Sequence, residues 1–134
     1  MLVAILEDDS RRIAAMRNIS FELLADYKVK FFDNAHAMSQ WLAKNIGRCD
    51  VLSLDCDLDS TILMGEDCGS GEDVTKFLTS ASIRCPVIIH SSNALRAPAM
   101  HMELALAGWT QVWLCPFSDA RQWASDIRRA RESR

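Results

Sequence analysis

Acidic side chains follow two short apolar segments of this chain, and together they can bind a hard divalent cation. The apolar segments are residues 2–6 and 51–54. Runs of this kind are typical of strands that are buried on both faces of a parallel sheet. Open parallel sheets bind their ligands at the carboxyl ends of the strands, so both acidic groups are expected to line one pocket. The acids in question are Glu7, Asp8 and Asp9 after the first segment, and Asp55 and Asp57 after the second.

Uncompensated carboxylates repel one another, so such a pocket is expected to hold a metal ion or a metal with a phosphate group. Oxygen ligands of this type suit Mg²⁺, or Mn²⁺ in its place. We predict a cation site formed by Glu7, Asp8 and Asp55, which Asp57 joins directly or through water. Aspartate at a helix N-terminus can instead cap the helix, and capping is the preferred interpretation for Asp9.

The elements that must position these acids alternate between strand and helix along the chain. Strands are expected at residues 2–6, 27–32, 51–55, 86–90 and 112–114. Helices are expected at residues 10–25, 34–46, 71–81 and 98–107, and a last helix is expected after a cap at Ser118. This alternation predicts an α/β fold, a doubly wound five-stranded parallel sheet of order 2-1-3-4-5 with helices on both faces. Residues 1–134 are expected to form one domain.

Composition limits the classes of partner. The net charge of −3 argues against general nucleic-acid binding. No apolar run has the length of a membrane span, and no basic leader precedes the first strand, so we expect a cytoplasmic protein with no membrane contact. The five cysteines lack the spacing of a zinc site and are expected to be reduced.

Four motifs carry a resemblance to a known family over the whole length of the chain. They are LEDD at residues 6–9, VLSLD at 51–55, VIIHS at 87–91 and CPF at 115–117. The series resembles the receiver domains of two-component signalling. The resemblance implies metal binding by Glu7 and Asp8, a phosphoacceptor position at Asp55, and a switch hydroxyl at Ser91.

Cys115 departs from the receiver pattern, because receivers carry a lysine at this position. A thiol cannot provide the ammonium charge that would pair with a phosphoryl group. The resemblance therefore does not imply a standard phosphorelay switch. The loop 57–70 is also longer than in most receivers, and we expect it to form a mobile cover that contributes ligand contacts. Residues 55–66 also fit the acid spacing of an EF-hand calcium loop, although Ser60 stands where that loop requires glycine.

A second series of motifs resembles a divergent branch of that family, the cyclic-phosphate-processing receiver domain. The branch reads LDHDL, TGxDV, HSxN and PF, and this chain has LDCDL at 54–58, SGEDV at 70–74, HSSN at 90–93 and PF at 116–117. The resemblance implies an acidic metal site that handles a phosphate-containing small molecule. Its ligand-binding positions in this chain are Ser70, Gly71, Asn93 and Cys115.

Three functions remain open from the sequence. The first is a stand-alone signalling domain whose metal pocket binds or processes a phosphate-containing group. The second is a metal-dependent phosphoesterase that acts on a cyclic phosphate or nucleotide, with Asp55, His90 and Ser91 as catalytic residues. The third is a degenerate receiver that serves as an interaction scaffold. His90 can also be a hydrogen-bonded core histidine, and Ser91 and Asn93 can be turn and cap residues.

The apolar residues around 98–107 and 112–114 indicate a surface for a protein partner or a second copy of the chain. The alternative interpretation is that they pack in the core.

Overall fold

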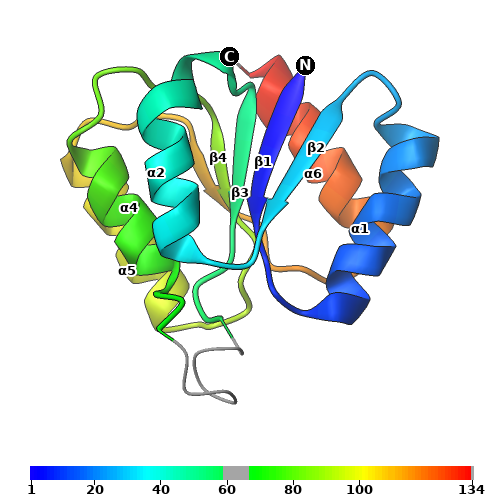
Figure 1. The fold of residues 1–134 in the computed structure, drawn as a ribbon, viewed down its shortest axis with the longest axis horizontal. Coiled ribbons are helices and arrows are strands. Elements are labelled where there is room, and N and C mark those ends of the chain that lie inside the picture. Colours follow the sequence, from blue (N-terminus) through cyan, green and yellow to red (C-terminus); the bar gives the residue numbers. More distant parts are fainter. Residues whose placement is uncertain (59–66, 134) are drawn as a thin grey trace.

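Five parallel strands form one sheet in the computed structural model, which describes residues 1–58 and 67–133 (Figure 1). The strands are β1 (Leu2–Leu6), β2 (Lys28–Phe32), β3 (Val51–Leu54), β4 (Val87–Ile89) and β5 (Val112–Leu114). Their order across the sheet is β2-β1-β3-β4-β5, which confirms the predicted topology. The strand that alternates lysine with apolar residues, β2, lies at one edge, where one face of it meets solvent.

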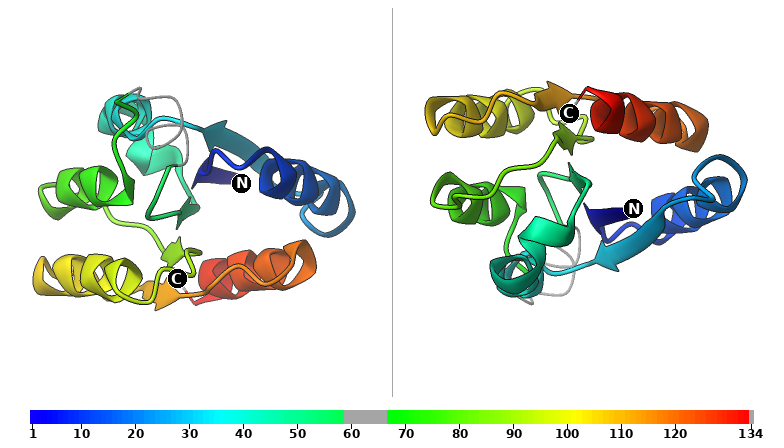
Figure 2. Two further views of the ribbon diagram at one scale, coloured as in Figure 1. Left: turned by 90° about the horizontal axis from the view of Figure 1, so that it is seen from below. Right: turned by 90° about the horizontal axis from the view of Figure 1, so that it is seen from above.

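Helices cover both faces of the sheet, as Figure 2 shows from the two ends of the strands. Helices α1 and α6 lie on one face, and α2, α4 and α5 lie on the other. The bounds are α1 (Ser10–Leu23), α2 (Ala35–Asn45), a 3-10 turn at Ile46–Arg48, α4 (Gly71–Thr79), α5 (Arg96–Leu106) and α6 (Ala120–Glu132). In the described ranges, none of these helices is both long and apolar enough to cross a lipid bilayer.

Aspartate side chains cap the first turns of α1 and α6. Asp9 caps α1 as predicted, because its Oδ1 accepts hydrogen bonds of 3.0 Å from the backbone N–H groups of Arg11 and Arg12. The predicted cap of α6 at Ser118 is wrong. The cap is Asp119, whose Oδ1 accepts from the N–H of Gln122 at 2.8 Å. A carboxylate is a stronger acceptor than a hydroxyl at the positive end of a helix.

Gly71 allows α4 to begin directly against the segment that follows β3. Its backbone N–H donates to the carbonyl of Cys56 at 2.8 Å. A Cβ atom at this position would lie 2.0 Å from the carbonyl oxygen of Asp55 and 2.8 Å from Cε of Met100. No side chain fits into that distance, so glycine is required for the close contact between α4 and the end of β3.

Candidate functional site

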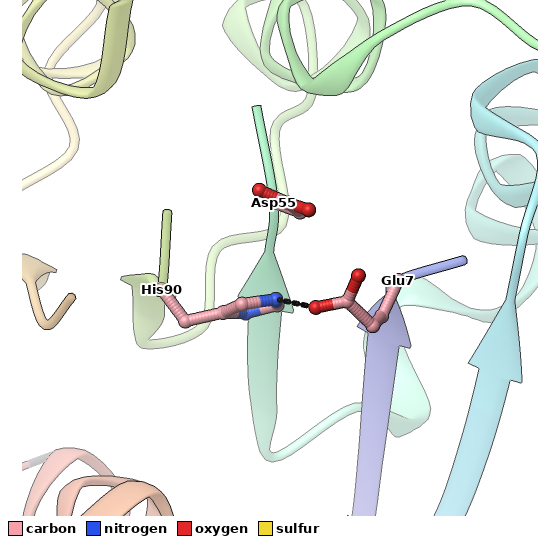
Figure 3. A group of neighbouring side chains, drawn as sticks. All are labelled: Glu7, Asp55 and His90. Atoms are coloured by element: carbon pink, nitrogen blue, oxygen red, sulfur yellow. Dashed lines mark hydrogen bonds and ion pairs between the residues drawn. The ribbon is translucent and has the colours of Figure 1, made fainter. Parts of the chain in front are cut away.

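Glu7, Asp55 and His90 meet at the carboxyl ends of β1, β3 and β4 (Figure 3). One potential ligand atom from each residue lies within 4.8 Å of the others. All three side chains are buried. Glu7 and Asp55 come together because β1 pairs with β3 in register, Leu6 beside Leu54, so that the next residue of each strand projects into the same pocket. The structure thus brings these two predicted acids together at the carboxyl edge of the sheet.

The electrostatics of the pair indicate a shortage of positive charge. Burial, followed by the negative charge of Glu7, raises the pKa of Asp55 to about 6. Burial also acts to raise the pKa of Glu7, but the hydrogen bond and the charge of His90 outweigh it, so the pKa of Glu7 is lowered. Two buried carboxylates, only one of which is well stabilised as an anion, match the oxygen donors that a hard divalent cation prefers.

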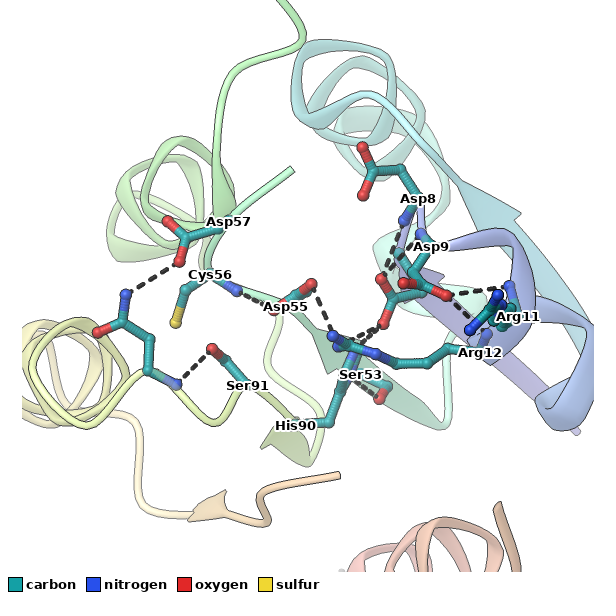
Figure 4. A network of polar contacts seen from close by, with 12 residues as sticks. Asp8, Asp9, Arg11, Arg12, Ser53, Asp55, Cys56, Asp57, His90 and Ser91 are labelled. Carbon is teal, nitrogen blue, oxygen red and sulfur yellow. Dashed lines mark hydrogen bonds and ion pairs between the residues drawn. The ribbon is translucent and has the colours of Figure 1, made fainter. Parts of the chain in front are cut away.

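Arg12 is the cation that contacts both carboxylates. Its Nη1 lies 3.3 Å from Oε1 of Glu7 and 3.7 Å from Oδ2 of Asp55. The cap formed by Asp9 holds the first turn of α1 so that Arg12 reaches back over the end of the sheet (Figure 4). The sequence motifs did not indicate Arg12 as a site residue. The available signal was an arginine in the first turn of the helix that follows the acidic motif.

A chain of buried hydrogen bonds supports His90 from the opposite side. The indole Nε1 of Trp123 in α6 donates to Oγ of Ser53 at 3.0 Å, and Oγ of Ser53 lies 2.7 Å from Nδ1 of His90. Nε2 of His90 lies 3.1 Å from Oε1 of Glu7. Ser53 and Trp123 were not among the predicted site residues, although Ser53 is the one polar residue in the apolar run 51–54.

The direction of these bonds follows from their donors. An indole can only donate, so Ser53 accepts from Trp123, and an ionised carboxylate can only accept, so Nε2 of His90 donates to Glu7. In the neutral imidazole, Nδ1 then accepts the hydrogen of Ser53. The neutral imidazole then carries its hydrogen on Nε2, and the imidazolium carries one there as well. In both states His90 donates to Glu7. Of the two interpretations of His90, catalytic residue or hydrogen-bonded core histidine, the fully buried position and the hydrogen bond to Glu7 favour the second.

An open cavity of about 290 Å³ lies next to the acidic cluster. It is lined by Arg12, Asp55, Asp57, Ser91, Ser92 and Asn93. Three of the predicted site residues therefore line one cavity with Asp55, and they come from the segments after β3 and β4. Oγ of Ser91 accepts a hydrogen bond of 3.0 Å from the N–H of Asn93, which holds the segment after β4 in a tight turn.

The other two predicted metal ligands, Asp8 and Asp57, lie outside the 4.8 Å cluster formed by the described residues. Asp57 lines the cavity, but its carboxylate accepts a hydrogen bond of 2.9 Å from Nδ2 of Asn93 and pairs with Arg96. Asp8 contributes its backbone N–H, which donates to Oε2 of Glu7 at 3.1 Å. Oδ1 of Asn93 also accepts from the backbone N–H groups of Leu95 and Arg96, in the turn that leads into α5.

The remaining ligand-binding predictions fall in three different environments. The N–H of Ser70 donates to Asp73 at 2.8 Å at the start of α4, and Gly71 is buried against the backbone of Asp55. The structure does not bring Cys115 to the acidic cluster. Cys115 lines a separate cavity of about 60 Å³ beside Asp126 of α6, and burial followed by the charge of Asp126 raises the pKa of its thiol to about 11.

The predicted loop cover and the EF-hand alternative concern residues 57–70 and 55–66, and both include residues 59–66. These residues lie outside the part of the chain that the structure describes.

Comparisons with known proteins agree with this architecture. The family described as "Cyclic-phosphate processing Receiver domain" matches residues 3–105. No curated protein matches the chain. Among solved structures, a signal receiver domain from Vibrio parahaemolyticus has a TM-score of 0.71 at 16% identity, over 98% of this chain and 90% of that chain.

Two further solved structures have the same fold. The receiver domain of a sensor histidine kinase from Pseudomonas aeruginosa, which has a magnesium ion coordinated in its active site cleft, has a TM-score of 0.70 at 16% identity, over 98% of this chain and 97% of that chain. The signal receiver domain of a histidine kinase from Syntrophus aciditrophicus has the same TM-score of 0.70 at 16% identity, over 98% and 90%. At this level of identity the similarity establishes the fold.

Proposed function

The chain belongs to the family of cyclic-phosphate processing receiver domains, and on this basis we propose that it is a receiver-like signalling domain that binds one divalent cation beside a phosphate-containing ligand. The observation that carries the proposal is the buried pair of Glu7 and Asp55 at the edge of an open cavity. In the ranges that the structure describes, Arg12 is the one arginine or lysine whose side chain pairs with both carboxylates, while His90 contacts Glu7 alone.

The residues that would hold the cation are Glu7 and Asp55, and Mg²⁺ or Mn²⁺ fits their oxygen donors. When bound, such an ion would offset the charge of both carboxylates and of a nearby phosphate group. His90 would keep Glu7 in position through its hydrogen bond at 3.1 Å. Ser91 lines the cavity beside Asp55, and its hydroxyl, which also contacts the thiol of Cys56, would turn toward a phosphate oxygen.

Binding of the phosphate-containing group is favoured over its hydrolysis or its transfer to Asp55. Both ring nitrogens of His90 are engaged by Ser53 and Glu7, so this histidine supports the site and has no free nitrogen for the ligand. Cys115 lies in a separate cavity and supplies no positive charge for a phosphoaspartate. A phosphate bound beside the cation needs neither of these groups.

Adding Mn²⁺ or Mg²⁺ is expected to raise the melting temperature of the protein. At a metal concentration about 100-fold above Kd, the gain in unfolding free energy is about 2.7 kcal/mol. Glu7→Gln and Asp55→Asn should each remove most of this gain, because each loses one of the two anionic ligands. Differential scanning calorimetry across a metal titration measures the effect.

A matched control is Asp33→Asn, which removes the same charge from an exposed residue outside the cluster. This variant should respond to metal like the parent protein. A melting temperature that does not change from micromolar to millimolar Mn²⁺ would contradict the proposed metal site. Inorganic phosphate should add further stabilisation only when the metal is present.

A second candidate function, binding of another copy of the chain, is favoured by exposed apolar side chains on α5, on β5 and at Leu95, just before α5. The exposed fractions are 83% for Leu95, 59% for Met102, 81% for Leu106 and 43% for Leu114. We call these residues the α5–β5 surface. We propose that the domain binds a second copy of itself through this surface.

Leu106→Asp is therefore expected to weaken self-association of the protein at high concentration, because it places a charge within an apolar contact. Phe21→Asp is the matched control, since Phe21 is 84% exposed but lies on α1, which covers the other face of the sheet. Sedimentation velocity over a concentration series measures both. A parent protein that stays monomeric throughout would exclude the second copy as the partner.

A further inference from the structure

Arg12 occupies the place between the two carboxylates that a bound cation would need. A single nitrogen, Nη1, approaches Oε1 of Glu7 at 3.3 Å and Oδ2 of Asp55 at 3.7 Å (Figure 4). Both distances exceed the 2.7–3.2 Å range of a well-formed N–H···O hydrogen bond. The guanidinium therefore offsets charge at the site without forming a closely fitted bidentate pair, which would be harder to displace.

The two sides of this contact differ in their freedom to move. The side chains of Glu7 and Asp55 are 0% and 9% exposed, whereas the side chain of Arg12 is 34% exposed. Glu7 is fixed by His90, and Oδ1 of Asp55 accepts a hydrogen bond of 2.8 Å from the N–H of Cys56. The backbone of Arg12 is held by the cap of Asp9, and its side chain lines the open cavity. The carboxylates are fixed, and the guanidinium is the group that can leave.

Arg12 is also placed to contact an anion in the same cavity. Within the described residues, it is the one cationic side chain among those that line the cavity with Asp55, Ser91 and Asn93. The other nearby guanidinium, that of Arg96, is already paired with Asp57 and with Glu72. The Cζ atom of Arg12 lies 6.0 Å from the ring centre of Phe117, and the face of this ring offers the guanidinium a second favourable contact.

We propose that Arg12 has two alternating roles at this site. Without metal it is the internal counter-cation of Glu7 and Asp55. When a divalent cation takes its place between the carboxylates, the displaced guanidinium binds the phosphate group of a ligand in the cavity. The inference rests on the proposed function for the metal and the phosphate. It adds that Arg12 opposes the binding of the metal ion and favours the binding of the phosphate.

The test is whether one substitution changes the affinities for two ligands, Mn²⁺ and inorganic phosphate, in opposite directions. In isothermal titration calorimetry, Arg12→Gln is expected to bind Mn²⁺ about fivefold more tightly than the parent protein, since no internal cation has to be displaced. With Mn²⁺ at saturation, the same variant is expected to bind inorganic phosphate about tenfold more weakly. A purely structural role of Arg12 would shift both affinities in the same direction.

Arg11→Gln is the matched control. It makes the same change in net charge at the preceding position of α1, but Arg11 is exposed and does not line the cavity. Both affinities of Arg11→Gln should remain within about twofold of the parent values, because an exposed charge is screened by salt. Equal effects of Arg11→Gln and Arg12→Gln would overturn the inference, and so would unchanged or weaker Mn²⁺ binding by Arg12→Gln.

A metal-free measurement separates the failure of this inference from the failure of the proposed metal site. Arg12→Gln and Asp55→Asn should be non-additive in their effects on melting temperature in EDTA, because the two side chains interact. Additive effects would overturn the counter-cation role of Arg12. If coupling is found but no variant binds Mn²⁺, then both the proposed metal site and the exchange are overturned, and the counter-cation role alone stands.

Discussion

Replacing Gly71 with alanine is expected to destabilise the protein by about 3 kcal/mol, because there is no room for a methyl group at this position. The added Cβ would lie 2.0 Å from the carbonyl oxygen of Asp55, which belongs to the backbone and cannot rotate away. Relief of the clash requires α4 to separate from the end of β3. The hydrogen bond from the N–H of Gly71 to the carbonyl of Cys56, 2.8 Å long, would then be lost as well.

Urea unfolding, followed by circular dichroism, measures this loss, and Gly47→Ala is the matched control. Gly47 lies in the 3-10 turn, and a Cβ there would meet only Cδ1 of Ile83 at 3.6 Å, an ordinary contact. That variant is expected to be neutral or to gain up to about 1 kcal/mol from the lower backbone entropy of its unfolded state. Because the clash involves the backbone of Asp55, Gly71→Ala should also weaken Mn²⁺ binding. Equal stability of the two variants would refute the packing argument.

Asp55→Asn is expected to stabilise the metal-free protein near neutral pH. The pKa of Asp55 in the folded protein is about 6, whereas the ordinary value is 3.8. A raised carboxyl pKa gives stability that is fully present below pH 3.8 and is lost as the pH rises through about 6. At pH 7 the ionised carboxylate therefore costs the parent protein roughly 3 kcal/mol, at about 1.4 kcal/mol for each pKa unit. Asparagine does not ionise and avoids this cost.

The pH profile of the unfolding free energy in EDTA provides the measurement. Between pH 5 and pH 7 the parent should lose stability and Asp55→Asn should lose less. Glu7 acts in the opposite direction, because its lowered pKa gives stability that is present above pH 4.5 and is lost as the pH falls below it. Asp33→Asn, at an exposed position, should follow the parent profile. A stability difference between Asp55→Asn and the parent that is the same at pH 5 and pH 7 would rule out ionisation of Asp55 as its cause.

Both predictions concern the same few atoms, because the backbone of Asp55 is held by α4 while its side chain faces Glu7. The helix that starts at Gly71 is packed against the carbonyl of Asp55, and Cys56 donates its N–H to the carboxylate of the same residue. The backbone of Asp55, a candidate metal ligand, is therefore held by packing against Gly71, and its carboxylate is held by the N–H of Cys56 opposite the charge of Glu7. This arrangement explains why a small change at Gly71 is expected to alter metal binding.

Local sequence patterns were sufficient to predict the fold and the central pair of acids. The buried strands are apolar runs, the edge strand alternates with lysine, and the capping aspartate Asp9 precedes a helix, and each of these is a property of neighbouring residues. The meeting of Glu7 with Asp55 followed from topology, because adjacent parallel strands end at the same edge of the sheet. The wrong cap at Ser118 shows the limit of such patterns, since Asp119 competes for the same role one residue later.

The tertiary structure decided which further side chains join the acids and which do not. Arg12 enters the site through the direction of the first turn of α1. Trp123 hydrogen-bonds Ser53, which lies 70 residues earlier in the chain, and through it supports His90. Cys115 is directed to a different cavity, and Asp57 is held by Asn93 and Arg96. These outcomes depend on side-chain directions and on competition between partners far apart in the sequence. Residue type and spacing define which contacts a side chain can make, but only the packed structure determines which contact it makes.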